Sequence, residues 1–86
     1  MVKLTAKLER IIFPKGVTRT SGGFAIASFG SISVEEGSIE LDEIFNNFKV
    51  KGEMPPLDTE NEYYLVIEEG ERHPKFGLTY ELVFMR

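Results

Sequence analysis

Alternating apolar and polar positions mark a first β-strand over residues 2–13. Every second residue from position 2 to position 8 is apolar, and the residues between them are polar or charged, which is the period of a half-buried strand. At positions 11–13 (IIF) both faces become apolar, so we expect this end of the strand to be covered on both sides. A long bent strand that passes between two sheets has this pattern, and such a strand closes a small barrel.

Four more strands are predicted along the chain, each bounded by turn residues. The segment 14–23 is a Gly-rich and Thr-rich loop, and Pro55 and Pro56 end the third strand and begin a turn that Asp58 or Thr59 would cap. No helical period exceeds a turn or two. The sequence therefore predicts an all-β fold, a single five-stranded barrel over residues 1–86. The later strands are expected within residues 23–30, 44–54, 62–68 and 78–84.

Two phenylalanines fall on opposite faces of the second strand. Phe24 shares a face with Ile26, whereas Phe29 shares the other face with two small alanines. One ring must therefore belong to the core. The other either packs at an outer corner of the barrel or stays partly exposed, where a nucleic-acid base could stack on it.

Five acids are concentrated in residues 31–43. Their order does not match an EF-hand calcium loop, and their spacing does not indicate a catalytic carboxylate pair. We predict a solvated excursion between strands, in which Ser33 and Glu36 cap a short helical turn.

Composition excludes several function classes. The 86 residues contain no cysteine and one histidine, and no phosphate-binding loop motif occurs, so we expect no catalytic residue, no metal site and no cofactor. No apolar run is long enough to span a membrane, and the start lacks the apolar core of a signal peptide. These features predict a soluble cytoplasmic protein with no membrane partner.

The formal net charge of −4 is unevenly distributed. Residues 1–24 carry +4 and residues 72–86 carry +2, whereas residues 25–71 carry −10. If residues 1–24 and 72–86 lie side by side in the fold, the molecule has a positively charged side despite its negative net charge. Otherwise the charged residues are spread over the solvated surface without a pattern.

The segment GERHPKFGLTYEL, residues 70–82, resembles the end of the N-terminal OB domain of RecD-like DNA helicases, the exodeoxyribonuclease V alpha subunit family. The most specific part is His73-Pro74-Lys75-Phe76-Gly77. LERIIF at residues 8–13 and KGEMPPLDTENEYYLVIEEG at residues 51–70 resemble other strands of that domain. The resemblance implies a small five-stranded OB-fold-like barrel.

The chain departs from this family in two connections and in length. The basic loop 14–23 replaces a short loop rich in Asn and Glu, and the acidic excursion 31–43 is longer than usual. RecD-like helicases also continue into helical-hairpin and ATPase domains, whereas this sequence ends at Arg86. The sequence is therefore either an excised domain of a larger helicase or a stand-alone protein with the same fold.

In OB folds the loops between strands 1 and 2 and between strands 4 and 5 flank a binding face made by strands 2 and 3. Cations and aromatic rings in these places suit single-stranded nucleic acid, because cations follow phosphates while rings stack on bases. Alternatively, Phe76 plugs the barrel end and His73 caps a backbone group. The candidate nucleic-acid-binding residues are Lys15, Arg19, Lys49, Lys51, Arg72, His73, Lys75 and Phe76.

These expectations lead to two function hypotheses. The first is a non-catalytic accessory domain of a RecD-like DNA helicase that acts in DNA repair and recombination. Such a domain would assist single-stranded DNA binding or dock on helicase motor domains in the same or a partner chain. The second is a stand-alone protein–protein interaction module that uses a sheet edge or the acidic segment 31–43.

Overall fold

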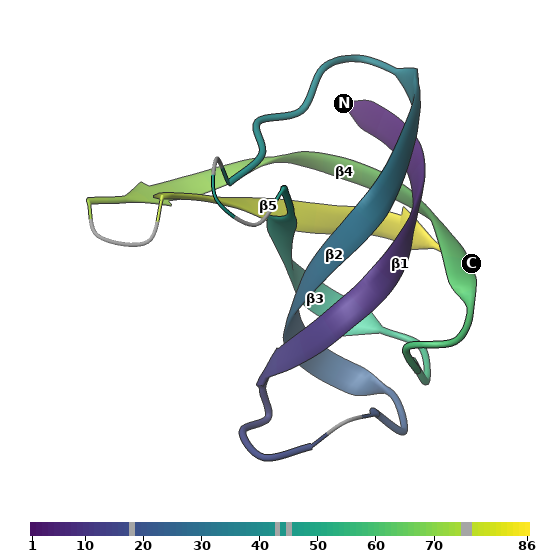
Figure 1. The fold of residues 1–86 in the computed structure, drawn as a ribbon. Coiled ribbons are helices and arrows are strands. Elements are labelled where there is room, and N and C mark those ends of the chain that lie inside the picture. Colours follow the sequence, from purple (N-terminus) through teal and green to yellow (C-terminus); the bar gives the residue numbers. More distant parts are fainter. Residues whose placement is uncertain (18, 43, 45, 75–76) are drawn as a thin grey trace.

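The computed structural model describes residues 1–17, 19–42, 44, 46–74 and 77–86, and all regular structure in these residues is β-strand (Figure 1). The side chain of His73 also lies outside the description, although its backbone is included. The strands are β1 (Val2–Phe13), β2 (Gly23–Glu36), β3 (Phe48–Met54), β4 (Glu62–His73) and β5 (Gly77–Met85).

The five strands form a closed barrel in the order β1-β2-β3-β5-β4 (Figure 1). β3 and β5 run parallel, and the other four pairings are antiparallel. β1 pairs with β2 along one side and with β4 along the other, so it belongs to both halves of the barrel, as expected for a strand shared by two sheets. The prediction of an all-β, small five-stranded OB-fold-like barrel is confirmed.

The core lies inside the barrel and is built from alternate residues of every strand. Phe29 stacks on Phe48 with ring centroids 5.9 Å apart, and Phe48 meets Tyr80 edge to face at 6.1 Å. Leu57, in the connection between β3 and β4, is also buried and adds to this core. In the same connection the Asp58 carboxylate accepts hydrogen bonds from the backbone N–H groups of Glu60 and Asn61, so Asp58 caps the turn.

The prediction for residues 31–36 was wrong, because β2 does not end at Gly30 but continues to Glu36. Ser33 pairs with Thr5, and Glu36 pairs with Lys3, so neither residue caps a helical turn. Ser31 has a φ of 52°, and the β1–β2 register shifts nearby. This bulge bends the strand without ending it. The mostly polar sequence of residues 31–36 resembles a loop and does not indicate the bulge.

The connector at residues 70–77 was predicted as a loop, but most of it is strand. β4 runs to His73 and β5 begins at Gly77, so the two strands form a long hairpin that projects from the barrel (Figure 1). The register shifts between Glu69 and Arg72, which places a bulge at the glycine between them. Gly70 therefore lets the strand continue through a sequence that resembles a turn.

The end of β1 is less covered than predicted. Ile11 is buried, but Phe13 keeps 50% of its surface exposed. The expectation that both faces are covered at residues 11–13 was therefore wrong for Phe13. The barrel pairs β1 with β4 only as far as Lys7, so β4 does not cover the far end of β1.

Gly70 is expected to tolerate no side chain, because a Cβ there would overlap the carbonyl oxygen of Thr79 in β5. The Gly70→Ala variant should lose about 1 to 3 kcal/mol of unfolding free energy, the usual effect of overpacking. Urea denaturation measures this loss. Gly30→Ala is the matched control, because the three atoms nearest to its Cβ all belong to the exposed Glu9 side chain, which can move aside by giving up its hydrogen bond from Asn47. Equal losses in the two variants would contradict this assignment.

Candidate nucleic-acid interface

The outer surface of β2 and β3 is defined by strand alternation. Ala25, Ala27 and Phe29 point into the core and are at most 1% exposed, so the residues between them lie on the opposite side of the sheet, where Ser28 is nonetheless covered at 2% exposed. Val50 is fully buried in β3, and the lysines on either side of it therefore also point outward. We call this surface the β2–β3 face; its members are Phe24, Ile26, Ser28, Lys49, Lys51 and Glu53.

Pairing between β1 and β2 places the end of β1 beside this face. Ile26 pairs with Phe13 on one side and with Lys51 on the other. One row further along, Ser28 lies between Arg10 and Lys49. Because directly paired residues point to the same side of a sheet, the β1 residues extend the β2–β3 face by an aromatic ring and a guanidinium.

Two phenylalanine rings form an exposed aromatic pair on this surface. Phe13 and Phe24 meet edge to face, with ring centroids 6.1 Å apart and planes inclined by 62°. Each residue is 50% exposed. The sequence left open whether both rings of β2 are core; the structure places Phe29 in the core and Phe24 at the surface. Half-exposed rings provide flat surfaces on which bases can stack.

The two lysines of β3 differ in their surroundings. Lys51 lies 3.8 Å from the Glu81 carboxylate of β5, so this acid partly offsets its charge. Lys49 pairs in register with Thr79, which carries no charge. Arg10 is exposed one strand away. The surface therefore carries three cations, Arg10, Lys49 and Lys51, against two acids, Glu53 and Glu81, beside its aromatic rings.

The β1–β2 loop brings Arg19 to one end of the β2–β3 face. Arg19 and Phe24 line the same shallow cleft of about 130 Å³. Thr20 fixes the loop: its N–H donates to the carbonyl oxygen of Leu57 at 3.2 Å, and its hydroxyl accepts from the Leu57 N–H at 3.1 Å. Lys15 is exposed in the same loop. A guanidinium and a ring in one cleft suit a phosphate and its neighbouring base.

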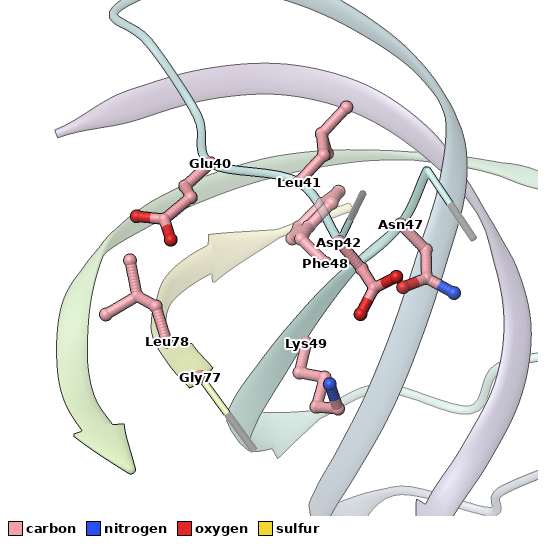
Figure 2. Close-up of a pocket in the computed structure, with 8 residues that line it drawn as sticks. All are labelled: Glu40, Leu41, Asp42, Asn47, Phe48, Lys49, Gly77 and Leu78. Atoms are coloured by element: carbon pink, nitrogen blue, oxygen red, sulfur yellow. The ribbon is translucent and has the colours of Figure 1, made fainter. Parts of the chain in front are cut away.

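A larger cleft of about 280 Å³ lies at the other end of the face (Figure 2). It is formed where the β2–β3 connection meets the first residues of β3 and β5. Lys49 belongs both to this cleft and to the β2–β3 face, so the two are continuous. The lining residues are Glu40, Leu41, Asp42, Asn47, Phe48, Lys49, Gly77 and Leu78.

Arg72 is engaged by an acid of the β2–β3 connection. Its two terminal nitrogens donate to the two Glu40 carboxylate oxygens at 3.0 and 2.6 Å. These hydrogen bonds hold the pKa of Glu40 below its usual range and raise the pKa of Arg72. Because the pKa of Glu40 is lowered on folding, the pair supports the folded state at neutral pH and loses this effect as pH falls through the lowered value.

The predicted site residues thus fall into three groups. Lys49 and Lys51 lie on the β2–β3 face, Arg19 lines a cleft beside it and Lys15 is exposed in the same loop as Arg19, whereas Arg72 lies on the hairpin, paired with Glu40. His73 is placed only by its backbone, which pairs with Gly77 at the hairpin end. Lys75 and Phe76 lie outside the described residues.

Sequence reasoning did not include three residues that the structure brings to the site: Arg10, Phe13 and Phe24. The alternation of β2 had indicated Phe24 as one of two rings that could be exposed. For Phe13, the apolar triplet pointed toward burial, because the sequence does not show where β4 stops covering β1. Arg10 follows Glu9 in a charged pair, and only the strand register places it beside Ser28.

Among the described residues, no group of three or more His, Cys, Asp or Glu side chains is placed to hold a metal ion. None of the described segments forms a helix long and apolar enough to cross a membrane. Comparison with protein-family models, with curated proteins and with solved structures gives no match to this sequence.

Proposed function

We propose that this chain is a non-catalytic OB-fold domain that binds single-stranded DNA along the β2–β3 face, as an accessory domain of a RecD-like helicase. The observation that carries the proposal is the exposed Phe13–Phe24 pair next to outward-facing cations. Bases would stack on the two rings, while Lys49, Lys51 and Arg19 contact the phosphates. The helicase context rests on the resemblance at residues 70–82.

The acidic total does not oppose this proposal, because many of the acids lie away from the β2–β3 face. Glu36, for example, lies 3.7 Å from Lys3, whereas Glu40 lines the cleft beside Lys49 but is engaged by Arg72. The acids on or beside the face are Glu53, which belongs to it, Glu81, which pairs with Lys51, and Asp42, which lines the cleft at its Lys49 end. A strand that follows Arg10, Lys49 and Arg19 therefore meets mainly positive charge, and salt should weaken its binding.

Salt dependence tests the phosphate contacts. We expect the domain to bind a labelled oligo-dT of about 15 nucleotides at low salt and to bind more weakly at 200 mM, as measured by fluorescence anisotropy. Lys49→Gln should lower the slope of log Kobs against log salt by about 0.7, the contribution of one phosphate contact on a single strand.

Lys3→Gln is the matched control, since it removes the same charge from the β1–β4 side of the barrel, where Lys3 pairs with Val66. Its salt slope should stay close to that of the unmodified domain. Equal slope changes in the two variants would mean that net charge, not the β2–β3 face, governs binding. No binding at low salt would contradict the proposal.

Docking on a protein partner is a second candidate function, favoured by an apolar patch on β4 and β5. Phe84 and Val83 are 49% and 48% exposed, and Phe84 meets the Tyr64 ring edge to face at 6.4 Å. The Arg86 guanidinium lies over the Tyr64 ring, 5.0 Å from its centroid. This patch would suit contact with helicase motor domains, and it involves different residues from the β2–β3 face.

A further inference from the structure

The Arg72–Glu40 pair has the geometry of an arginine bound to a phosphate. Both terminal nitrogens of the guanidinium donate to one carboxylate, one to each oxygen, at 3.0 and 2.6 Å. The side chains are 58% and 54% exposed, so another anion can approach from solvent. The same two donors fit two oxygens of a phosphate group equally well.

Glu40 is also held through its backbone. Its N–H donates to the hydroxyl oxygen of Tyr80 at 2.9 Å. Tyr80 is 2% exposed, and its ring packs edge to face on Phe48 in the core. The β2–β3 connection therefore stays attached to the barrel when the carboxylate leaves Arg72, because the backbone hydrogen bond does not depend on the side chain.

The pair lies at the border of the proposed DNA path. Glu40 lines the 280 Å³ cleft together with Lys49, which also belongs to the β2–β3 face. Figure 2 shows the Glu40 side chain beside Leu78 on one side of the cleft, with Lys49 below. A strand that runs along the face past Lys49 would enter this cleft and bring a phosphate near Arg72.

We propose that Arg72 is a phosphate-binding position that Glu40 occupies in the free protein, so that an incoming strand must displace an intramolecular competitor. This inference rests on the proposed function and concerns the regulation of the same interface. An exposed ion pair is weak, so displacement is feasible once the strand is held elsewhere. A tethered carboxylate also acts at an effective concentration on the order of millimolar.

The competitor has a consequence for selectivity. A free phosphate or a mononucleotide contacts Arg72 alone and must compete directly with the tethered carboxylate. A strand that already stacks on Phe24 and contacts Lys49 is itself tethered, so its phosphate competes on equal terms. Glu40 therefore favours polymeric single strands over small anions.

Glu40→Gln tests the inference, because it removes the competing charge but keeps the size of the side chain and the backbone bond to Tyr80. We expect the affinity for oligo-dT of about 15 nucleotides to rise roughly two- to fivefold at low salt, the range expected for an exposed pair. Glu36→Gln is the control, since it removes one negative charge from an ion pair with Lys3 instead. It should raise affinity less.

A double-mutant cycle separates competition from general electrostatics. Arg72→Gln alone should weaken binding, and Glu40→Gln should give no further gain in that background. If Glu40→Gln and Glu36→Gln change affinity equally, or if the Glu40→Gln gain persists without Arg72, the competitor role is wrong although the domain binds DNA. If no variant binds the oligonucleotide, both the competitor role and the proposed function fail.

Discussion

Replacing Phe24 by alanine is expected to weaken oligo-dT binding by about 1 to 3 kcal/mol, roughly five- to 150-fold in Kd, because one stacking surface is lost. Phe24 is half exposed and holds the Phe13 ring in edge-to-face contact, so the substitution also frees its partner. Fluorescence anisotropy at constant low salt measures the change. The barrel should remain folded, since Phe24 lies outside the core.

Phe84→Ala is the matched control for this measurement. Phe84 is 49% exposed, almost the same as Phe24, and it also contacts a neighbouring aromatic ring, that of Tyr64. It lies on β5 and pairs with Val66 of β4, away from the β2–β3 face. We expect Phe84→Ala to leave Kd unchanged. A similar loss in both variants would contradict the location of the binding surface.

Phe29→Ala should have the largest effect on stability. The ring is fully buried and stacks on Phe48, and removing a buried phenylalanine costs about 3 to 5 kcal/mol. A domain of this size has roughly 4 to 13 kcal/mol of total stability, so the substitution removes a large part of it and should strongly lower the denaturation midpoint. Urea and thermal denaturation followed by circular dichroism measure the difference.

Phe24→Ala, five residues earlier in the same strand, is the reference for that experiment. Its loss of unfolding free energy should be much smaller, because the residue keeps half of its surface in water. The two substitutions thus separate folding from binding within β2. If Phe24→Ala destabilises the barrel as much as Phe29→Ala, the ring is part of the core and the proposed stacking surface does not exist.

Strand alternation predicted the barrel because each strand buries one face. The period over residues 2–8 identified β1 as a half-buried strand. That both halves of the barrel share this strand was inferred from the apolar triplet 11–13, although β4 pairs with residues 2–7 instead. In β4, Leu65 and Ile67 lie two residues apart and are both fully buried, as the period of a strand requires. Alternation repeats every two residues and is visible in a short window, so five strands and one core could be inferred without homologues.

Bulges were the features that sequence reasoning missed. Ser31 and Gly70 occur among polar residues that also suit loops, and only pairing with β1 and β5 keeps those segments in the sheet. The candidate site was incomplete for a related reason. Phe13 reads as core in an apolar triplet, and its exposure depends on where β4 ends its pairing with β1. A short stretch of sequence does not show where two strands that are distant in the chain stop pairing.

Arg72 shows the same limit for charged residues. From the sequence, a cation next to a turn is expected to be free to bind phosphate. The fold instead brings Glu40, 32 positions earlier in the chain, into contact with the guanidinium of Arg72. Neither composition nor spacing indicates this pair. The sequence could therefore identify candidate cations for the interface, but it could not show which of them already form ion pairs with acids.

Amide chemical-shift mapping tests the central claim most directly. The domain, labelled with ¹⁵N, is titrated with oligo-dT at low salt, and the shift of each assigned backbone amide is followed. We predict the largest changes at Phe13, Phe24, Ile26, Lys49 and Lys51, with little change at Tyr64 and Phe84. Changes confined to the Tyr64–Phe84 patch, or no changes at all, would contradict a DNA-binding β2–β3 face.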